Sequence, residues 1–313
     1  MADYITSRRF TIILVIIIAT TITSLYGSLT SMAASISSSS ASSTTATQTA
    51  ASTAFKFLSL FTSSGNSIPS FTSFIALLGP FIGLSLGFDA INNERSEGTL
   101  NRLLSQPIYR DGVIVGKFLA GCSIIFITIF SMGVLIGAIG LMAIGVPPSG
   151  EETARLITYL FFTSVYVAFW LALSMLFSVV CRHAATSALA SIAVWLVCAI
   201  FISLLAGIIS NGMFPLTNTS DVTAQVNNYT LQLGLNRISP YYLFSEAAST
   251  IMNPSVRTIN VVTEQSLSGA VSGYLSYGQS VLLVWPHLTA LIAMTLIAFA
   301  ISYVNFMRQE IRS

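Results

Sequence analysis

The sequence predicts an all-α membrane protein with six transmembrane helices and with both termini in the cytoplasm. The first observation is its composition: 54% of the residues are hydrophobic and 8% are charged, whereas a soluble domain carries about 25% charged residues. The mean hydropathy is +0.80. The second is a set of six apolar runs, each long enough to cross a bilayer, which takes about 20 residues. The third is the uneven distribution of arginine and lysine between the connecting segments.

The first two apolar runs are separated by a long polar segment. Residues 10–27 form the first predicted span and residues 71–90 form the second. Between them, residues 28–70 are rich in Ser, Thr and Ala, and Lys56 is their only charged residue. Such a low-complexity segment is too polar to span a membrane. We expect an outer loop, with the Phe and Leu side chains of its second half at the outer membrane surface.

Five glycines mark helix faces that are predicted to pack closely. Gly79, Gly83 and Gly87 recur at every fourth residue of the second run, and Gly133 and Gly137 repeat this spacing in the third. Residues four apart lie on one side of a helix. Small residues at such positions allow the backbone of a neighbouring helix to approach, so we predict helix packing at these glycines.

Four further runs complete a single transmembrane domain over residues 1–313. They comprise residues 113–145, 155–181, 184–209 and 281–304. The fourth and fifth runs are joined by a very short connection, which predicts that these two spans are antiparallel neighbours.

Residues 210–280 form a second long polar segment, which we also expect on the outer side. Asn218 and Asn228 each begin an Asn-x-Ser/Thr triplet, the acceptor sequence for N-glycosylation. From Pro240 to Ile251, apolar residues recur at helical spacing opposite a polar side. This pattern predicts a short amphipathic helix that lies on the outer leaflet or re-enters it.

The basic residues assign the two sides of the membrane. Six spans place both termini on the same side as the loop at residues 91–112. The residues on that side are Arg8, Arg9, Arg95, Arg102, Arg110, Lys117, Arg182, Arg308 and Arg312. The residues on the other side, spread over long loops, are Lys56, Arg155, Arg237 and Arg257. The positive-inside rule makes the richer side cytoplasmic, and this choice places both glycosylation triplets outside.

We find no catalytic or metal-binding pattern in the sequence. Gly116 and Lys117 resemble the end of a nucleotide-binding P-loop, but the upstream glycine is replaced by Asp111 and the residue after the lysine is Phe118, so the pattern fails. The net charge of +2, from scattered basic residues, gives no support for a nucleic-acid partner. Few ionisable residues fall within the spans, and His287 is predicted to be a packing residue. Without a charge relay, the energy for transport is expected to come from elsewhere.

The densest cluster of charge, residues 92–117, lies between two apolar runs and must therefore sit in water at a membrane face. It reads, in order, Glu94-Arg95-Ser96-Glu97-Gly98-Thr99-Leu100, then Leu103-Leu104-Ser105-Gln106-Pro107, then Arg110 and Gly116-Lys117. This order resembles the cytoplasmic loop of the type-2 ABC exporter permeases, a family that exports drugs, lipids, polysaccharides and other cargo. The six spans and the Ser239–Phe244 segment, which resembles the family's outer re-entrant region, also fit.

The resemblance implies a transmembrane subunit that works as a dimer, with an identical or a related permease, and with two copies of a separate ABC ATPase subunit. ATP and Mg²⁺ would be bound by that partner, and no cofactor is expected on this chain. In the family the polar loop forms a coupling helix that docks in a groove of the ATPase. Here residues 99–105 would form it and Pro107 would end it. The predicted coupling residues are Glu94, Arg95, Glu97, Gly98, Thr99, Leu100, Leu103, Leu104, Pro107 and Arg110.

The sequence therefore predicts the permease of an ATP-driven exporter in the plasma membrane, surrounded by membrane lipids. Long aliphatic walls favour an amphiphilic cargo, such as a lipid, a glycolipid, a drug or a hydrophobic peptide, which would pass along a dimer interface formed by the first, second and fifth spans. Two alternatives remain open. A secondary carrier or channel predicts flux without ATP, and a non-transporting glycosylated scaffold predicts that Glu97 and Leu104 are dispensable.

Overall fold

The computed structural model describes residues 8–39, 55–64, 68–96, 110–145, 147–215, 222–256 and 274–308. Every regular element in these ranges is helical, as the all-α prediction requires. Six helical segments are long and apolar enough to cross a membrane, which confirms the predicted number of spans. They cover residues 11–31, 71–94, 111–143, 150–180, 184–213 and 277–308.

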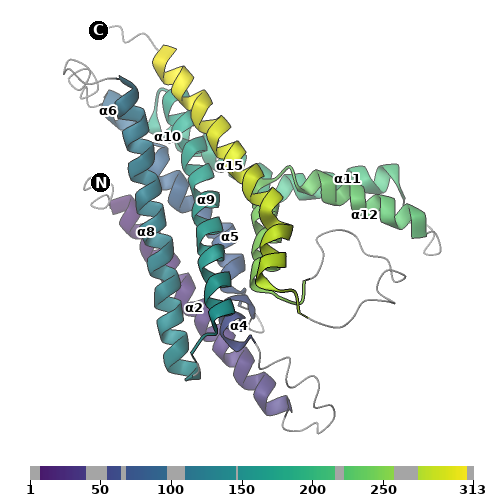
Figure 1. Cartoon of the computed structure of the whole chain (residues 1–313). Helices are drawn as coiled ribbons and strands as arrows, with labels where there is room; N and C mark the ends of the chain where they lie inside the picture. The colour runs from purple at the N-terminus through teal and green to yellow at the C-terminus, as the bar shows by residue number, and fades with distance from the viewer. Residues whose placement is uncertain are drawn as a thin grey trace.

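Helix α9 (Gly150–Val180) is the centre of the bundle. Helices α5 (Phe71–Gly87), α8 (Arg110–Ile144) and α15 (Tyr277–Arg308) pack against it. Its side chains Tyr166 and Trp170 have no exposed surface. We call the end of the bundle near Val180 the elbow end and the end near Gly150 the far end. The elbow end, at the top of Figure 1, holds α6 and the last turns of α15.

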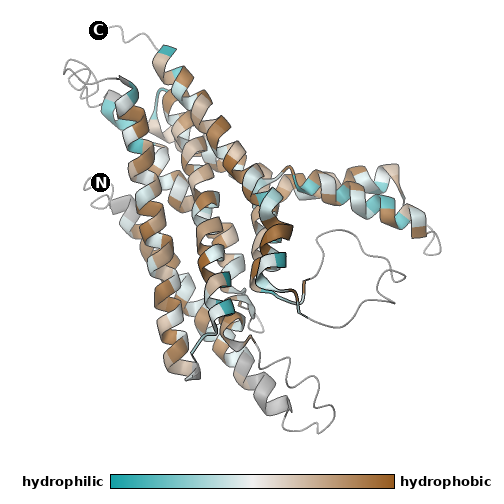
Figure 2. Ribbon diagram, viewed as in Figure 1, coloured by the Kyte–Doolittle hydropathy of each residue, from teal (hydrophilic) through white to brown (hydrophobic). Residues whose placement is uncertain are grey.

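The outer surface of the bundle is apolar along the length of the long helices. Figure 2 shows apolar residues along α8, α15 and α11, whereas hydrophilic residues gather near the ends of the bundle and on α12. A helix of about 30 residues is roughly 45 Å long, which exceeds the roughly 30 Å hydrocarbon core of a bilayer. The long helices therefore have the length and the surface that a membrane span needs.

The first polar segment is more structured than its composition indicates. Helix α2 (Arg8–Ser39) extends well past the predicted end of the first span. Helix α4 (Lys56–Thr62) buries Phe57, Leu58 and Phe61 in the core. The sequence places these side chains at the membrane surface, whereas the structure inserts them between helices. Local composition could not predict the burial of these side chains, because the apolar side of one short helix becomes buried only through tertiary packing.

The fifth apolar run forms a helix that changes direction. Helix α10 (Ala184–Leu196) packs on α9, as the short connection predicts, and continues through the π-helix η1 (Val197–Phe201) into α11 (Ile202–Met213). Figure 1 shows α11 leaving the bundle sideways and pairing with α12 (Val222–Asn236), a helix that the sequence did not predict. We call this pair the α11–α12 arm.

Helix α13 (Pro240–Met252) is the predicted amphipathic helix, and it lies inside the bundle. Ser239 caps its first turn and also donates a hydrogen bond from Oγ to the Cys198 carbonyl in η1, at 2.6 Å. Its apolar side packs against α9, α15 and α5. The ring of Phe244 stacks on that of Tyr166, with centroids 4.3 Å apart. The helix therefore re-enters the bundle beside η1 and runs back to the far end.

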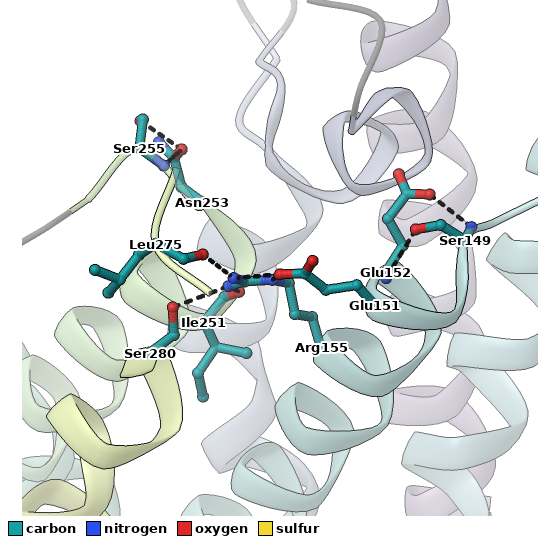
Figure 3. Close-up of polar contacts among 9 residues, drawn as sticks. All are labelled: Ser149, Glu151, Glu152, Arg155, Ile251, Asn253, Ser255, Leu275 and Ser280. Carbon is teal, nitrogen blue, oxygen red and sulfur yellow. Dashed lines mark hydrogen bonds and ion pairs between the residues drawn. The ribbon is translucent and has the colours of Figure 1, made fainter. Parts of the chain in front are cut away.

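The far end of the bundle is held together by one buried arginine. Arg155 on α9 has no exposed side-chain surface and pairs with Glu151 at 2.9 Å. It also donates hydrogen bonds to the Ile251 carbonyl at 2.9 Å, to Ser280 Oγ at 3.1 Å and to the Leu275 carbonyl at 2.7 Å. Figure 3 shows these partners converging from α13 and from the start of α15. The sequence places Arg155 in an outer loop, whereas the structure buries it as a link between three helices.

Candidate functional site

The candidate site is the polar turn between the second and third spans, which the charge cluster predicts to face the cytoplasm, and we call its described part the elbow. It comprises the turn at residues 88–91 and the short helix α6 (Asn92–Ser96). The elbow is anchored to α9 by Ser178. The Ser178 hydroxyl oxygen accepts hydrogen bonds from the backbone amides of Ile91 at 3.1 Å and Asn92 at 3.2 Å. Ile91 and Asn92 are both buried, so the elbow is packed against the end of α9 as well as hydrogen-bonded to it.

A lysine anchors the same elbow to α8. Lys117 Nζ lies 2.5 Å from Glu94 Oε1 and donates a hydrogen bond to the Ala90 carbonyl at 2.6 Å. Both charged side chains are 21% exposed, so the pair is only partly screened by solvent. The sequence analysis noted Lys117 only as part of an incomplete P-loop pattern. In the structure, its side chain connects the end of α5 to the start of α8. The elbow is therefore continuous with α5 and is bonded to both α9 and α8.

The predicted coupling residues are only partly within the described chain. Glu94 lies in α6 and makes the ion pair with Lys117. Arg95 also lies in α6, and Arg110 is the first residue of α8. The predicted coupling helix at 99–105 lies outside the described residues. So do Glu97, Gly98, Thr99, Leu100, Leu103, Leu104 and Pro107.

Two of the predicted packing glycines bring the backbones of α5 and α9 together. A Cβ atom on Gly83 would lie 2.4 Å from the Val167 carbonyl oxygen and 2.8 Å from the Leu171 amide nitrogen. A Cβ atom on Gly87 would lie 2.8 Å from the Leu171 carbonyl oxygen. Only glycine fits such contacts, because backbone atoms cannot shift as a side chain can. Ser174 Oγ of α9 also donates to the Leu84 carbonyl at 3.0 Å, so α5 and α9 form one closely packed pair.

The other three glycines have looser surroundings. A Cβ on Gly79 would be 3.4 Å from Val167, and one on Gly137 would be 3.5 Å from Phe57, which is ordinary van der Waals contact. A Cβ on Gly133 would lie 2.5 Å from the Leu160 side chain of α9, which can adjust. The spacing pattern thus locates the faces, and the closest backbone approach is confined to Gly83 and Gly87.

A cluster of ionisable side chains lies where α13 and the segment after α12 meet the last span. Glu246 on α13 has one carboxylate oxygen, Oε2, 2.7 Å from His287 Nε2 on α15. Arg237, just after α12, donates from Nε to Oε2 at 3.0 Å and from Nη2 to Oε1 at 2.9 Å. The sequence analysis missed this cluster because it assigned both Glu246 and Arg237 to the outer loop. The amphipathic pattern predicted that this helix lies on the outer leaflet or re-enters it, but it did not indicate which side chains Glu246 would meet.

The two predicted glycosylation sites differ in accessibility. Asn218 lies outside the described residues. Asn228 is 1% exposed. Its Nδ2 atom, to which a glycan would be attached, donates to Asn211 Oδ1 at 2.9 Å and to the Phe214 carbonyl at 2.7 Å. Both Nδ2 protons are therefore used within the folded arm, and glycosylation of Asn228 stays a prediction.

The fold and the elbow define an all-α polytopic membrane protein in which one polar turn is tied to several spans. Among the described residues, no group of three His, Cys, Asp or Glu side chains could hold a metal ion. The sequence model of the ABC-2 family transporter proteins matches residues 1–311. The chain belongs to this family, so it is the transmembrane subunit of an ABC transporter, as the resemblance over residues 94–117 predicts.

Two curated relatives support the same class over shorter segments. The chain is 44% identical over 59 residues to the probable ABC transporter permease protein NosY of Pseudomonas aeruginosa, which covers 19% of this chain and 22% of the relative. It is 37% identical over 87 residues to the protein of the same name from Stutzerimonas stutzeri, which covers 28% of this chain and 32% of the relative. The matched segments thus span less than a third of either relative.

Proposed function

We propose that this chain is the permease of an ATP-driven exporter and that a separate ATPase subunit drives it through the elbow. The observation that carries the proposal is the anchoring of the elbow by Ser178 on α9 and Lys117 on α8. Two ATPase copies, which bind ATP and Mg²⁺, would act on a permease dimer. The elbow end, with its arginines and Lys117, would face the cytoplasm of a cell whose plasma membrane holds the complex.

The proposed displacement of the loop by the ATPase would be transmitted to three helices through specific contacts. The ATPase would grip the loop that contains Leu100, Leu103 and Leu104, as the family resemblance implies. A displacement of this loop would act on α5 through the chain itself, on α9 through Ser178 and on α8 through Lys117. Because α5 and α9 touch backbone to backbone at Gly83, these two helices would move as one body. The moving body would therefore include α9, the fourth span, which the sequence alone did not indicate.

A second copy of the permease, identical or related, would cover the exposed side of the fifth span. Within the chain, only 6% of the most apolar 18-residue stretch of the 184–213 segment is buried. Its exposed side chains include Leu189, Leu196, Ile200 and Phe201. Long apolar surfaces of this kind suit the acyl or aromatic part of an amphiphilic cargo, which would pass between the two copies and be exported.

The secondary carrier that the sequence analysis left open is not supported by the family match, because that match makes the chain the transmembrane subunit of an ABC transporter. A carrier would move its cargo when no ATPase subunit is present, whereas the proposed exporter would not.

We expect Lys117→Met to uncouple ATP hydrolysis from transport. The variant removes a charge-assisted hydrogen bond and an ion pair from the elbow, and such a bond contributes about 1.5–3 kcal/mol. The complex of permease and ATPase is reconstituted in vesicles with a fluorescent phospholipid as probe. The number of probe molecules moved per ATP should fall roughly tenfold, the equivalent of about 1.4 kcal/mol, while the ATPase still co-purifies.

Arg182→Met is the matched control, because Arg182 is an exposed basic residue at the same end of the bundle. It should leave the transport ratio near that of the wild type. Equal losses in both variants would mean that Lys117 contributes only positive charge, and the elbow would not be the coupling element.

A further inference from the structure

The α11–α12 arm exposes an apolar surface that the coupling route does not use. Helix α11 has five large apolar side chains that are 43–69% exposed. They are Leu204, Leu205, Ile208, Ile209 and Met213. In the described chain, residues 184–215 and 222–236 contain no Asp, Glu, Lys or Arg. An exposed surface that is both apolar and uncharged favours a partner that is itself apolar.

The base of the arm lies along the bundle and not at its end. The Cys198 carbonyl of η1 accepts the hydrogen bond from Ser239, the residue before α13. Helix α13 then runs for 13 residues to the far end, which corresponds to about 20 Å along a helix axis. Figure 1 shows the arm leaving the side of the bundle between its two ends. Arg237, which follows α12, has its charge paired with Glu246, as charged side chains at membrane depth usually do.

At this depth the arm would meet hydrocarbon. Helix α9 has 31 residues and is about 46 Å long, whereas the hydrocarbon core of a bilayer measures about 30 Å. If the excess is divided equally, about 8 Å of the bundle projects at each end. The base of the arm would then lie about 12 Å inside the hydrocarbon boundary nearest the far end, which is within that leaflet.

The contact between α11 and α12 has the features of a helix pair in a membrane. Ala206 and Ser210, one turn apart, are the buried residues of α11, and small residues let helices approach closely in lipid. Asn228 donates both of its Nδ2 protons within the arm, to Asn211 Oδ1 and to the Phe214 carbonyl. This carbonyl follows the last turn of α11, where backbone carbonyls have no partner within the helix. The side chain of Asn228 thus supplies a hydrogen bond that hydrocarbon cannot.

The two helices of the arm differ in polarity. Figure 2 shows apolar residues along α11 and hydrophilic residues on α12, and α12 lies on the side of the arm nearer the far end (Figure 1). The exposed side chains of α12 include Thr223, Asn227 and Tyr229. Tyrosine is enriched where hydrocarbon meets water. The arm therefore becomes more polar in the direction in which a leaflet does, from its acyl chains toward its headgroups.

We infer that the α11–α12 arm is a lipid-binding hairpin embedded in the leaflet nearest the far end. Acyl chains cover α11, and α12 lies toward the headgroups. The exposed apolar side chains of α11, from Leu204 to Met213, extend over roughly half of the helix circumference, whereas one packed helix needs a narrower stripe. The second copy proposed above would instead lie against the exposed side chains of α10 and η1. This property does not depend on which cargo is moved or on the ATPase.

The position of the arm is tested by electron paramagnetic resonance of the full-length chain in phosphatidylcholine vesicles. The three cysteines are replaced by serine, and one spin label is attached at Ile208 on α11 or at Tyr229 on α12, which are both exposed. The collision rate of each label is measured with oxygen, which enters hydrocarbon, and with a water-soluble nickel chelate, which does not. Labels at the exposed residues Val134 on α8 and Ser255 after α13 are the references for lipid and for water.

We expect the oxygen-to-nickel collision ratio at Ile208 to be near that at Val134 and roughly tenfold above that at Ser255, because hydrocarbon excludes a polar solute. The ratio at Tyr229 should lie between those at Ile208 and Ser255. Leu204 is a second exposed site on α11 should labelling at Ile208 disturb folding.

Three results would overturn the inference. A ratio at Ile208 as low as that at Ser255 would place the arm in water. Shielding of Ile208 from both reagents would mean that a second copy or another protein covers α11. A ratio at Tyr229 above that at Ile208 would mean that α12, and not α11, faces the acyl chains.

Discussion

Arg155→Met is expected to destabilise the bundle by about 3–5 kcal/mol, because it leaves buried acceptors on neighbouring segments without a donor. The acceptors are the Ile251 and Leu275 carbonyls and Ser280 Oγ. The Ile251 carbonyl lies in the last turn of α13, where helix carbonyls have no partner within the helix. Methionine fills much of the same volume, so the loss would come from hydrogen bonds and charge rather than from a cavity.

The measurement is thermal unfolding of the detergent-solubilised protein, followed by size-exclusion chromatography of a fluorescent fusion. Glu151→Gln is the matched control. It removes the ionic partner of Arg155, but that side chain is 39% exposed, so its loss should cost no more than about 1 kcal/mol. A midpoint for Arg155→Met as close to the wild type as that of the control would contradict the assignment of Arg155 as the link between α9, α13 and α15.

Gly83→Val is expected to abolish the native packing of α5 on α9. Its Cβ atom would lie 2.4 Å from the Val167 carbonyl oxygen, and the two helices would have to separate along much of their length. Overpacking of a core typically costs about 1–3 kcal/mol and sometimes more. We expect the upper end of this range or beyond, because the clash is with backbone. The yield of monodisperse protein and its unfolding midpoint should both fall sharply.

Gly137→Ala is the control for this prediction. The added Cβ atom would make an ordinary 3.5 Å contact with Phe57, and alanine favours a helix over glycine by about 1 kcal/mol. Gly137→Ala should therefore unfold at or slightly above the wild-type midpoint. Normal yield and stability of Gly83→Val would show that α5 and α9 are not in backbone contact.

The spans could be predicted from sequence because run length and composition directly reflect the thickness and polarity of a bilayer. The face of α5 that meets α9 was also predictable, since Gly83 and Gly87 repeat at a helical period. The cap of α13 follows the same local logic, because Ser239 precedes Pro240 and accepts a hydrogen bond from the Tyr242 amide. These features depend on neighbours in the sequence.

The features that could not be predicted depend on contacts between distant segments. Arg155 and Leu275 are 120 residues apart in the chain, and Glu246 and His287 are 41 apart. The sequence pattern placed Arg155 and Glu246 on the outer side and allowed the helix that holds Glu246 to re-enter the membrane, but it could not indicate which distant segments these two side chains would contact. The anchoring role of Lys117 was missed for the same reason, since its partner Ala90 offers only a backbone carbonyl.

The central claim is that a separate ATPase grips this permease at the loop between α5 and α8. The most direct test is affinity purification of the tagged chain from its native membranes in mild detergent, followed by quantitative mass spectrometry. The wild type should bring down a P-loop ATPase in an equal molar ratio. Leu104→Glu should insert into the membrane normally but lose that partner, because a charge would replace the apolar contact of the predicted coupling helix. Recovery of the wild-type chain alone, under conditions that preserve other complexes, would contradict the account.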